Sequence, residues 1–196
     1  MEELVSCILS QHSADVVTFP TFSALMVQYR EWDAIAALSV EELARSIKAV
    51  GLANQKAKSI LAVLSEVSAK FGSYDLSALA RLPLEESLAW LESLPGVGPK
   101  TASIVMCFSF GQHAIPVDTH VQRVCTRLGV LPLKANPKAA HALLRQVVPI
   151  GGAYGFHVAL IEHGRAVCTA RAPQCPRCVL KSLCPRIGVG EDGADV

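Results

Sequence analysis

The hydrophobic residues of this chain recur at the spacing of helices, and strand signals are weak. Near the start, one helical face is formed by Leu4, Val5, Ile8 and Leu9. Ser39 and Glu42 have the spacing of a capping box, which predicts a helix that ends at Gly51. A longer amphipathic helix is predicted from about Asn54 to Lys70, before Gly72. Its apolar face consists of Ile60, Leu61, Leu64 and Val67.

The second half of the chain continues this helical pattern. Asp118 is well placed to begin a helix, because a carboxylate stabilises the positive end of the helix dipole. Pro99 suits the first position of another helix. The predicted helices span Leu84 to Leu94, Pro99 onward, Asp118 to about Leu128, Pro137 to Val148 and Tyr154 to Gly164. The expected fold class is therefore all-α, with a division near Gly111 to Pro116.

Composition indicates a folded protein in a reducing compartment. The 196 residues are 51% hydrophobic and 18% charged, enough for one or two small domains with a core. No apolar run reaches the roughly 18 residues that a membrane span needs, and the N-terminus has no basic segment of a signal peptide. We expect a cytoplasmic protein, associated with the nucleoid if bacterial, and no membrane partner. Seven cysteines then favour a metal site or free thiols over disulfides.

Charge is informative only locally, because the net charge is +1. Between residues 165 and 186 the chain has no acidic residue and five basic ones, Arg165, Arg171, Arg177, Lys181 and Arg186. Such a patch can bind phosphates in a nearly neutral protein, although a solvated loop face would look the same.

The segment Leu94 to Gly98 joins two predicted helices through two glycines. Glycine allows close backbone approach, and the N–H groups that open the next helix can bind a phosphate oxygen. Lys100 follows in the first turn, where the helix dipole and partial burial disfavour a charged ammonium. A free amine can form a Schiff base, although pairing with phosphate is the simpler interpretation. Asp118 by itself is readily explained as an N-cap.

Four of the seven cysteines have the spacing C-x6-C-x2-C-x5-C: Cys168, Cys175, Cys178 and Cys184. This spacing permits a zinc site with four thiolates or a [4Fe–4S] cluster. The remaining cysteines, Cys7, Cys107 and Cys125, lie in apolar helical segments and are expected to be small buried side chains.

Together, the segments LPGVGPKTA, PVDTHVQRV and HVALIEHGRAVC and the cysteine run resemble the endonuclease III branch of the helix-hairpin-helix DNA glycosylases. The resemblance also covers LSQHSADV and GLANQKAKSI, and so most of the chain. It implies a six-helix barrel at 1–112 with the hairpin at 94–98, an iron–sulfur cluster domain at 113–187 and a disordered tail at 188–196. Family members normally have a further N-terminal segment, so this chain begins within an early helix of the barrel.

The same resemblance implies a bifunctional DNA glycosylase and AP lyase of base excision repair. Its nucleophile falls on Lys100 and its aspartate on Asp118, and monofunctional relatives lack the lysine. The enzyme would remove a damaged base, by analogy an oxidised pyrimidine, and cleave the strand by β-elimination through a Lys100 Schiff base. The four cysteines from Cys168 to Cys184 would hold a [4Fe–4S] cluster. The partner would be double-stranded DNA with damaged bases or abasic sites, bound by a monomer.

Other contacts with DNA carry over by position. Gln11 or His12 would fill the gap left by the flipped nucleotide, and Leu52 would wedge into the duplex. The remaining expected DNA contacts are Lys56, Gly96, Val97, Gly98, Arg171, Arg177 and Lys181. Two alternatives remain at this point: a mismatch-type glycosylase of the same fold, and a non-catalytic DNA-binding module. Lys100 and Asp118 together argue against the latter, because phosphate binding alone requires neither.

Overall fold

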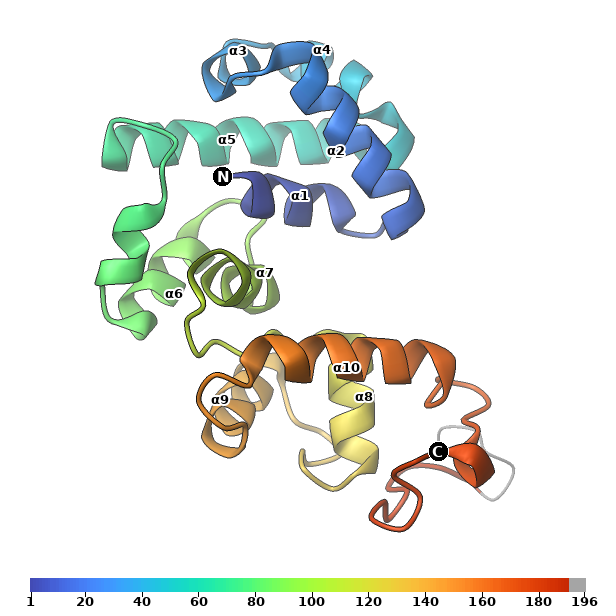
Figure 1. Ribbon diagram of the computed structural model, residues 1–196. Helices are drawn as coiled ribbons and strands as arrows, with labels where there is room; N and C mark the ends of the chain where they lie inside the picture. The colour runs from blue at the N-terminus through green and yellow to red at the C-terminus, as the bar shows by residue number, and fades with distance from the viewer. Residues whose placement is uncertain (191–196) are drawn as a thin grey trace. The chain divides into compact units, whose positions relative to one another are not determined.

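A computed structural model describes residues 1–190 as two compact helical units, Met1–Val105 and a second that begins at Met106 (Figure 1). The described residues contain no β-sheet, which confirms the all-α expectation. The first unit contains α1 (Glu2–Ser10), α2 (Asp15–Tyr29), α3 (Trp32–Ala36), α4 (Val40–Ser46), α5 (Ala53–Phe71), α6 (Leu84–Ser93) and α7 (Pro99–Ile104). Short 3-10 helices at Lys48–Val50 and Ser77–Arg81 lie between them.

The core of the first unit forms where α5 packs against α1 and α4. The side chains predicted to form the apolar face of α1 are all fully buried: Leu4, Val5, Ile8 and Leu9. On α5, Ile60, Leu64 and Val67 are likewise buried, whereas Leu61 is only half-buried at the edge of that face. Gly72 ends α5 in the left-handed conformation that the sequence predicts for a C-cap.

The capping box of α4 is confirmed by reciprocal hydrogen bonds. Glu42 N–H donates to Ser39 Oγ, and Ser39 N–H donates to Glu42 Oε2 at 2.8 Å. The helix ends at Ser46, before the expected Gly51, because a 3-10 turn at Lys48–Val50 intervenes.

Helix α2 has no counterpart in the sequence prediction. Apolar residues occur on all its sides, and Pro20 lies inside it, so the helical periodicity is lost. Leu25 is buried, while Val16 and Val27 are about four-fifths exposed (79% and 76%).

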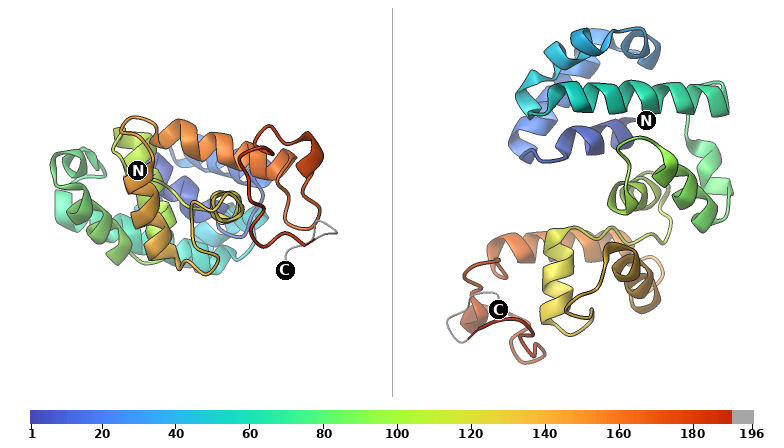
Figure 2. Two further views of the ribbon diagram at one scale, coloured as in Figure 1. Left: turned by 90° about the horizontal axis from the view of Figure 1, so that it is seen from below. Right: turned by 180° about the vertical axis from the view of Figure 1, so that it is seen from behind.

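The second unit contains α8 (Thr119–Arg127), α9 (Pro137–Val147), α10 (Ala153–Ala166) and a 3-10 turn at Cys175–Arg177. Helices α8 and α10 pack against each other (Figure 2). The unit begins at Met106, whereas the sequence placed the boundary at 112. A π-helical turn at Val105–Ser109 extends α7, and its Phe108 ring packs on Tyr154 and His157 of α10.

The end of the chain is described only in part. Of the expected disordered tail, residues 191–196 lie outside the described residues. Gly188 lies in a turn in which Val189 N–H donates to Arg186 O, and the neighbouring Ile187 N–H donates to Arg127 O of α8. No helix of residues 1–190 is both long and apolar enough to cross a membrane.

Candidate active site and cysteine loop

The hairpin Leu94–Gly98 joins α6 and α7 in a turn closed by a hydrogen bond from Val97 N–H to Leu94 O. Gly96 has φ +80°, and a Cβ added there would lie 2.8 Å from Ser59 Oγ of α5. Gly98 instead faces open space. Val97 has its side chain buried and its N–H engaged in this turn, so the expected DNA contact at Val97 is not supported. Gly96 is thus required by the fold, while Gly98 is free to meet a ligand.

Lys100 is the second residue of α7 and is half-buried, as the sequence predicts. Cys7 of α1 lies near its ammonium group. Burial raises the pKa of Cys7 to about 12, and the positive charge of Lys100 offsets part of this rise. The Cys7 thiol also donates a hydrogen bond to Glu3 Oε1 at 3.6 Å. The surroundings of Lys100 therefore include a buried, neutral thiol from α1.

Asp118 is the N-cap of α8, and its Oδ1 accepts a hydrogen bond from Val121 N–H at 2.8 Å. The extended segment before it is held by buried histidines. His157 Nδ1 lies 2.8 Å from Pro116 O, and His141 forms a hydrogen bond with the backbone of Ile115. Burial lowers the pKa of His141 to about 4, which keeps this ring neutral. Asp118 is therefore set on a rigid segment at the positive end of a helix.

In the turn after α1, Gln11 and His12, the two alternatives for the residue that fills the gap, have different environments. Gln11 Nε2 donates to Gly96 O at 2.8 Å, which ties this turn to the hairpin. His12 is exposed and has φ +54°, an uncommon conformation for a side chain other than glycine or asparagine. Of the two, His12 projects outward and Gln11 holds the turn.

A second exposed turn carries Leu52, which is 55% exposed and lies in the left-handed region at φ +49°. Leu52 shares a pocket of about 410 Å³ of empty space with the first turn and the hairpin. Its lining is Gln11, His12, Leu52, Gln55, Lys56, Ser59 and Gly96. Sequence reasoning missed Gln55 and Ser59. These two residues are four apart on α5 and therefore lie on the same face of that helix, and Gln55 follows Leu52 by three residues.

The expectation that Lys56 contacts phosphate is corrected by its burial, since it is only 4% exposed. Its ammonium donates to Leu9 O at 2.7 Å, Ser13 Oγ at 2.8 Å and Val50 O at 2.9 Å. An ammonium has three N–H donors, so all are used inside the protein. Burial also lowers the pKa of Lys56.

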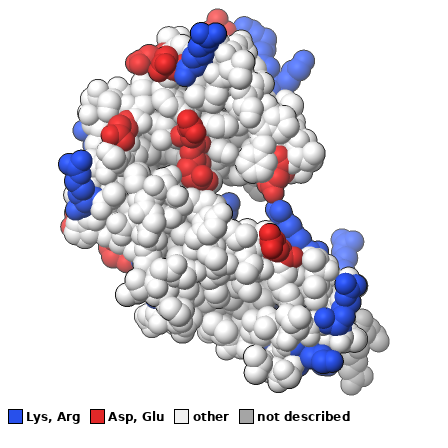
Figure 3. Space-filling view, in the orientation of Figure 1, with Lys and Arg blue, Asp and Glu red and all other residues white. Residues whose placement is uncertain are grey.

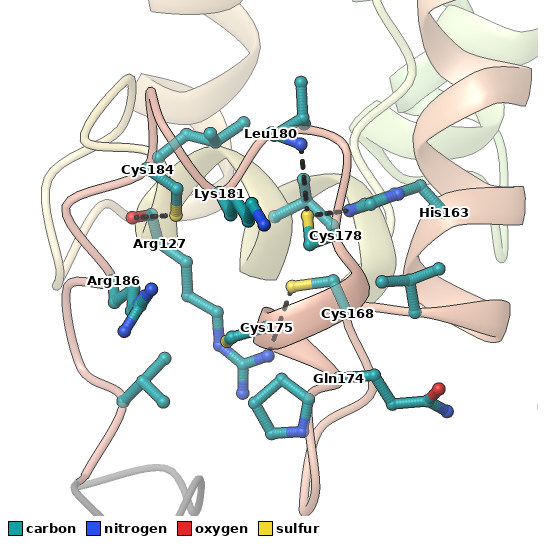
Figure 4. Close-up of a pocket in the computed structure, with 15 residues that line it drawn as sticks. Arg127, His163, Cys168, Gln174, Cys175, Cys178, Leu180, Lys181, Cys184 and Arg186 are labelled. Carbon is teal, nitrogen blue, oxygen red and sulfur yellow. Dashed lines mark hydrogen bonds between the residues drawn. The ribbon is translucent and has the colours of Figure 1, made fainter.

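The four cysteines of the C-terminal loop line one cavity in the second unit (Figure 4). It contains about 420 Å³ of empty space. The thiols are Cys168, Cys175, Cys178 and Cys184. The other three cysteines are buried, as predicted, and burial raises the pKa values of Cys107 and Cys125, the latter to about 12. The chain thus has two sets of thiols that differ in burial.

Hydrogen-bond donors point at the sulfur atoms in this cavity. Arg127 Nη1 donates to Cys168 Sγ at 3.2 Å, and Leu180 N–H donates to Cys178 Sγ at 3.4 Å. His163 Nε2 lies 3.5 Å from Cys178 Sγ. Such donors stabilise thiolates that bear the negative charge of a metal cluster.

The four thiols are a donor set that a metal centre can use. Four cysteine thiolates can hold either a structural zinc ion or a [4Fe–4S] cluster. In this chain all four surround one cavity of the second unit. The residues present therefore fit a metal centre with four cysteine ligands.

Basic side chains surround this loop (Figure 3). Arg171, Arg177 and Lys181 are all exposed. Arg127 is instead buried at 3% and also donates to Thr169 O and Ala170 O, so it organises the loop from within. The exposed residues remain available for phosphate.

Comparisons with known proteins agree with this architecture. Residues 5–149 match the family model of the HhH-GPD superfamily base excision DNA repair protein. Endonuclease III of Buchnera aphidicola is 37% identical over 183 residues, which cover 93% of this chain and 82% of that protein.

Solved structures give the same result. A trapped endonuclease III–DNA covalent intermediate, an estranged-adenine complex, has a TM-score of 0.81 and 32% identity, covering 94% of this chain and 82% of that one. A thermostable thymine-DNA glycosylase has a TM-score of 0.81 at 28% identity, with the same coverage. The expected helix-hairpin-helix glycosylase fold is confirmed. The chain belongs to the endonuclease III family of the HhH-GPD superfamily, and is a DNA-binding, bifunctional glycosylase and AP lyase of base excision repair.

Proposed function

We propose that Lys100 is the nucleophile of this enzyme and that its reaction proceeds through a Schiff base. The observation that carries the proposal is a half-buried lysine in the first turn of the helix that follows the hairpin, in a chain of this family. A DNA-binding module without catalysis has no use for an amine at this place, since phosphate contacts are better made from an exposed side chain.

The reaction begins when the damaged nucleotide leaves the stack, at a cost of a few kcal/mol that is smaller for damaged bases. The Lys100 amine attacks C1′ of the sugar while the C1′–N bond to the base breaks, and the base leaves with a proton. The C1′–O4′ bond then breaks as the nitrogen lone pair forms the protonated imine, and O4′ takes a proton from solvent to become a hydroxyl. Loss of a C2′ proton then sends its electron pair into a C2′–C3′ double bond, and the 3′ phosphate leaves.

Asp118 stabilises positive charge that develops on the sugar and assists the deprotonation of Lys100. A fixed carboxylate is effective in this role because it needs no reorganisation as the charge forms. Its backbone is already held by the helix that it caps and by the His157 contact with Pro116.

The DNA contacts follow from exposure. His12 fills the gap left by the flipped nucleotide, and Leu52 wedges into the duplex. The hairpin binds one phosphate through the backbone N–H groups of Gly96 and Gly98, because the Val97 N–H is used in the turn itself. Arg171, Arg177 and Lys181 bind further phosphates from the cysteine loop.

The four thiols from Cys168 to Cys184 hold a [4Fe–4S] cluster. The cluster supplies a rigid cross-link that shapes this basic loop. Arg127 donates to Cys168 Sγ and His163 Nε2 lies beside Cys178 Sγ, so both side chains orient these cysteines.

The proposed substrate is double-stranded DNA that contains an oxidised pyrimidine or an abasic site, bound by a monomer. A mismatch-type glycosylase is the second candidate, because a thymine-DNA glycosylase matches the fold with the same TM-score, 0.81. Lys100 favours the strand-cleaving enzyme, since monofunctional relatives lack that amine.

Borohydride trapping tests this function. The protein is mixed with a duplex that contains one abasic site, and borohydride reduces any imine to a stable adduct. We expect a covalent adduct with the wild-type protein and none with Lys100→Ala, while both bind the duplex. Wild-type protein that binds the duplex without forming an adduct would contradict the proposal and favour a binding module.

A further inference from the structure

Two exposed turns in the first unit share an unusual backbone feature. One joins α1 to α2 and carries His12, and the other precedes α5 and carries Leu52. Both residues have positive φ, +54° and +49°, although neither is glycine. Such conformations persist only where surrounding contacts over-determine them, and they are typical of functional sites.

Those contacts converge on one buried cation. Lys56 Nζ donates to Leu9 O at the end of α1 and to Ser13 Oγ in the first turn, at 2.7 and 2.8 Å. Its third donor reaches Val50 O in the second turn, at 2.9 Å. Ser13 Oγ in addition donates to Val50 O, so the two turns are also linked directly.

The arrangement costs free energy, because it places a charged group where only 4% of its surface meets solvent. An apolar residue at position 56 would pack among the same helices without that cost. What an apolar residue cannot do is hold two backbone carbonyls and a hydroxyl at fixed positions. The charge is therefore explained by geometry and not by the stability of the core.

We propose that Lys56 is a positioning residue that sets the two DNA-probing turns, those of His12 and Leu52, relative to each other. The inference rests on the proposed function, in which His12 occupies the vacated gap and Leu52 enters the duplex. If either turn moves, the side chains no longer act on the same base step, and the nucleotide returns to the stack.

This role predicts a difference between two substrates. Extrusion of a base that is still stacked depends on both turns, whereas an abasic site offers little resistance to extrusion. Loss of Lys56 should therefore impair base excision more than strand cleavage at a preformed abasic site.

The test compares Lys56→Met with the wild-type protein on duplexes that carry either thymine glycol or an abasic site. Lys58→Met is the matched control, because it removes one exposed lysine of the same helix. We expect single-turnover excision by Lys56→Met to fall at least about tenfold while cleavage of the abasic site changes less than about threefold. The control should change both rates equally.

A second variant and a fluorescence measurement distinguish loss of positioning from misfolding of Lys56→Met. Ser13→Ala keeps the ammonium but removes the hydroxyl that links both turns, and it should shift the two rates in the same unequal way. A 2-aminopurine placed opposite an uncleavable abasic analogue should fluoresce less with either variant than with wild type, because the wedge disturbs stacking less.

Different outcomes test the positioning role of Lys56 and the proposed function of the enzyme. Equal loss on both substrates, or wild-type excision by Lys56→Met, would overturn the positioning role. Failure of the wild-type protein to cleave the abasic duplex would instead overturn the proposed function.

Discussion

In the proposed reaction, Asp118 combines a structural and a chemical task in one side chain. Its Oδ1 caps α8 through Val121 N–H, and its charge lies at the positive end of that helix. The two tasks differ in what they require: a cap needs only an acceptor oxygen, whereas stabilisation of a cationic sugar needs a negative charge.

This difference makes Asp118→Asn informative. Asparagine caps helices about as well as aspartate, so the free energy of unfolding should stay within about 0.5 kcal/mol of wild type. Adduct formation with an abasic duplex should nevertheless slow by about 100-fold or more, because the charge is lost. Asp118→Ala, the companion variant, should slow the reaction similarly and also lose about 1 kcal/mol of stability. Wild-type trapping rates for Asp118→Asn would refute a role for the charge.

His141 gives a pH dependence of stability. Burial lowers its pKa from 6.5 to about 4, assisted by the charge of Arg145 and by His157 and opposed by the Ile115 hydrogen bond. Between these two pH values the unfolded chain binds a proton that the folded chain does not, so stability falls as the pH drops from 6.5 to 4. The full contribution is about 3 kcal/mol.

Urea unfolding at pH 7, 5 and 4 measures this contribution. His141→Gln should lose less stability over that interval than wild type does. Identical pH profiles for the two proteins would show that His141 does not titrate as its burial implies.

Single residues also show where sequence reasoning ends. Lys100 and Asp118 lie at helix starts as the sequence predicts, because glycine, proline and aspartate mark such starts locally. The burial of Lys56 could not be predicted, since two of its acceptors come from residues more than forty positions earlier in the chain. The same holds for Gln11, whose partner Gly96 is 85 residues away.

At the level of elements, the hairpin separates two uses of glycine. Gly96 has φ +80° and no room for a Cβ against Ser59 of α5. Gly98 has φ −106° and open space beside it. The pattern G-x-G in the sequence does not distinguish them, because the difference arises from a helix far along the chain.

The two alanine variants should therefore behave differently. Gly96→Ala should destabilise the protein by about 1–3 kcal/mol, from strain and from contact with Ser59. Gly98→Ala should unfold at nearly the wild-type temperature but bind duplex DNA more weakly, because its methyl group faces the incoming phosphate. Thermal unfolding and fluorescence anisotropy with a labelled duplex provide the comparison. Equal unfolding temperatures for the two variants would contradict this assignment.

Elements with one buried face were the ones that the sequence predicted. Helix α5 was placed nearly to its ends, since its apolar stripe and Gly72 are both local signals. Helix α2 was missed because Val16 and Val27 are exposed alongside the buried Leu25, which removes the periodicity on which prediction depends.

At the scale of the whole molecule, the interactions that stabilise each unit internally differ between the two. The first has a continuous apolar core between α1 and α5. The cysteine loop of the second has few buried apolar side chains, and Val179 and Leu183 are 85% and 76% exposed. We therefore expect its order to depend on the proposed cluster that the four thiols would hold.

Removal of the proposed cluster should consequently affect the chain unevenly. We expect backbone amides of residues 168–189 to lose protection from hydrogen exchange after oxidative loss of iron, followed by the last turn of α8, which contacts the loop through Arg127. Amides of α1 and α5 should keep their protection. Loss of protection throughout both units, or none in the loop, would show that the loop is not held by the cluster.

Helix α8 also fixes the direction of Asp118 at its start relative to that of Arg127 at its end. Its nine residues begin directly after Asp118 and end at Arg127, whose guanidinium grips the cysteine loop. Since each residue turns a helix by about 100°, the relative direction of the carboxylate and the guanidinium depends on the number of residues between them. Inserting one alanine into α8 would turn one end away from its partner, whereas inserting seven would nearly restore the alignment and lengthen the helix by about 10 Å. Insertions into α8 therefore preserve the alignment of its two ends only when they add close to a whole number of helical turns.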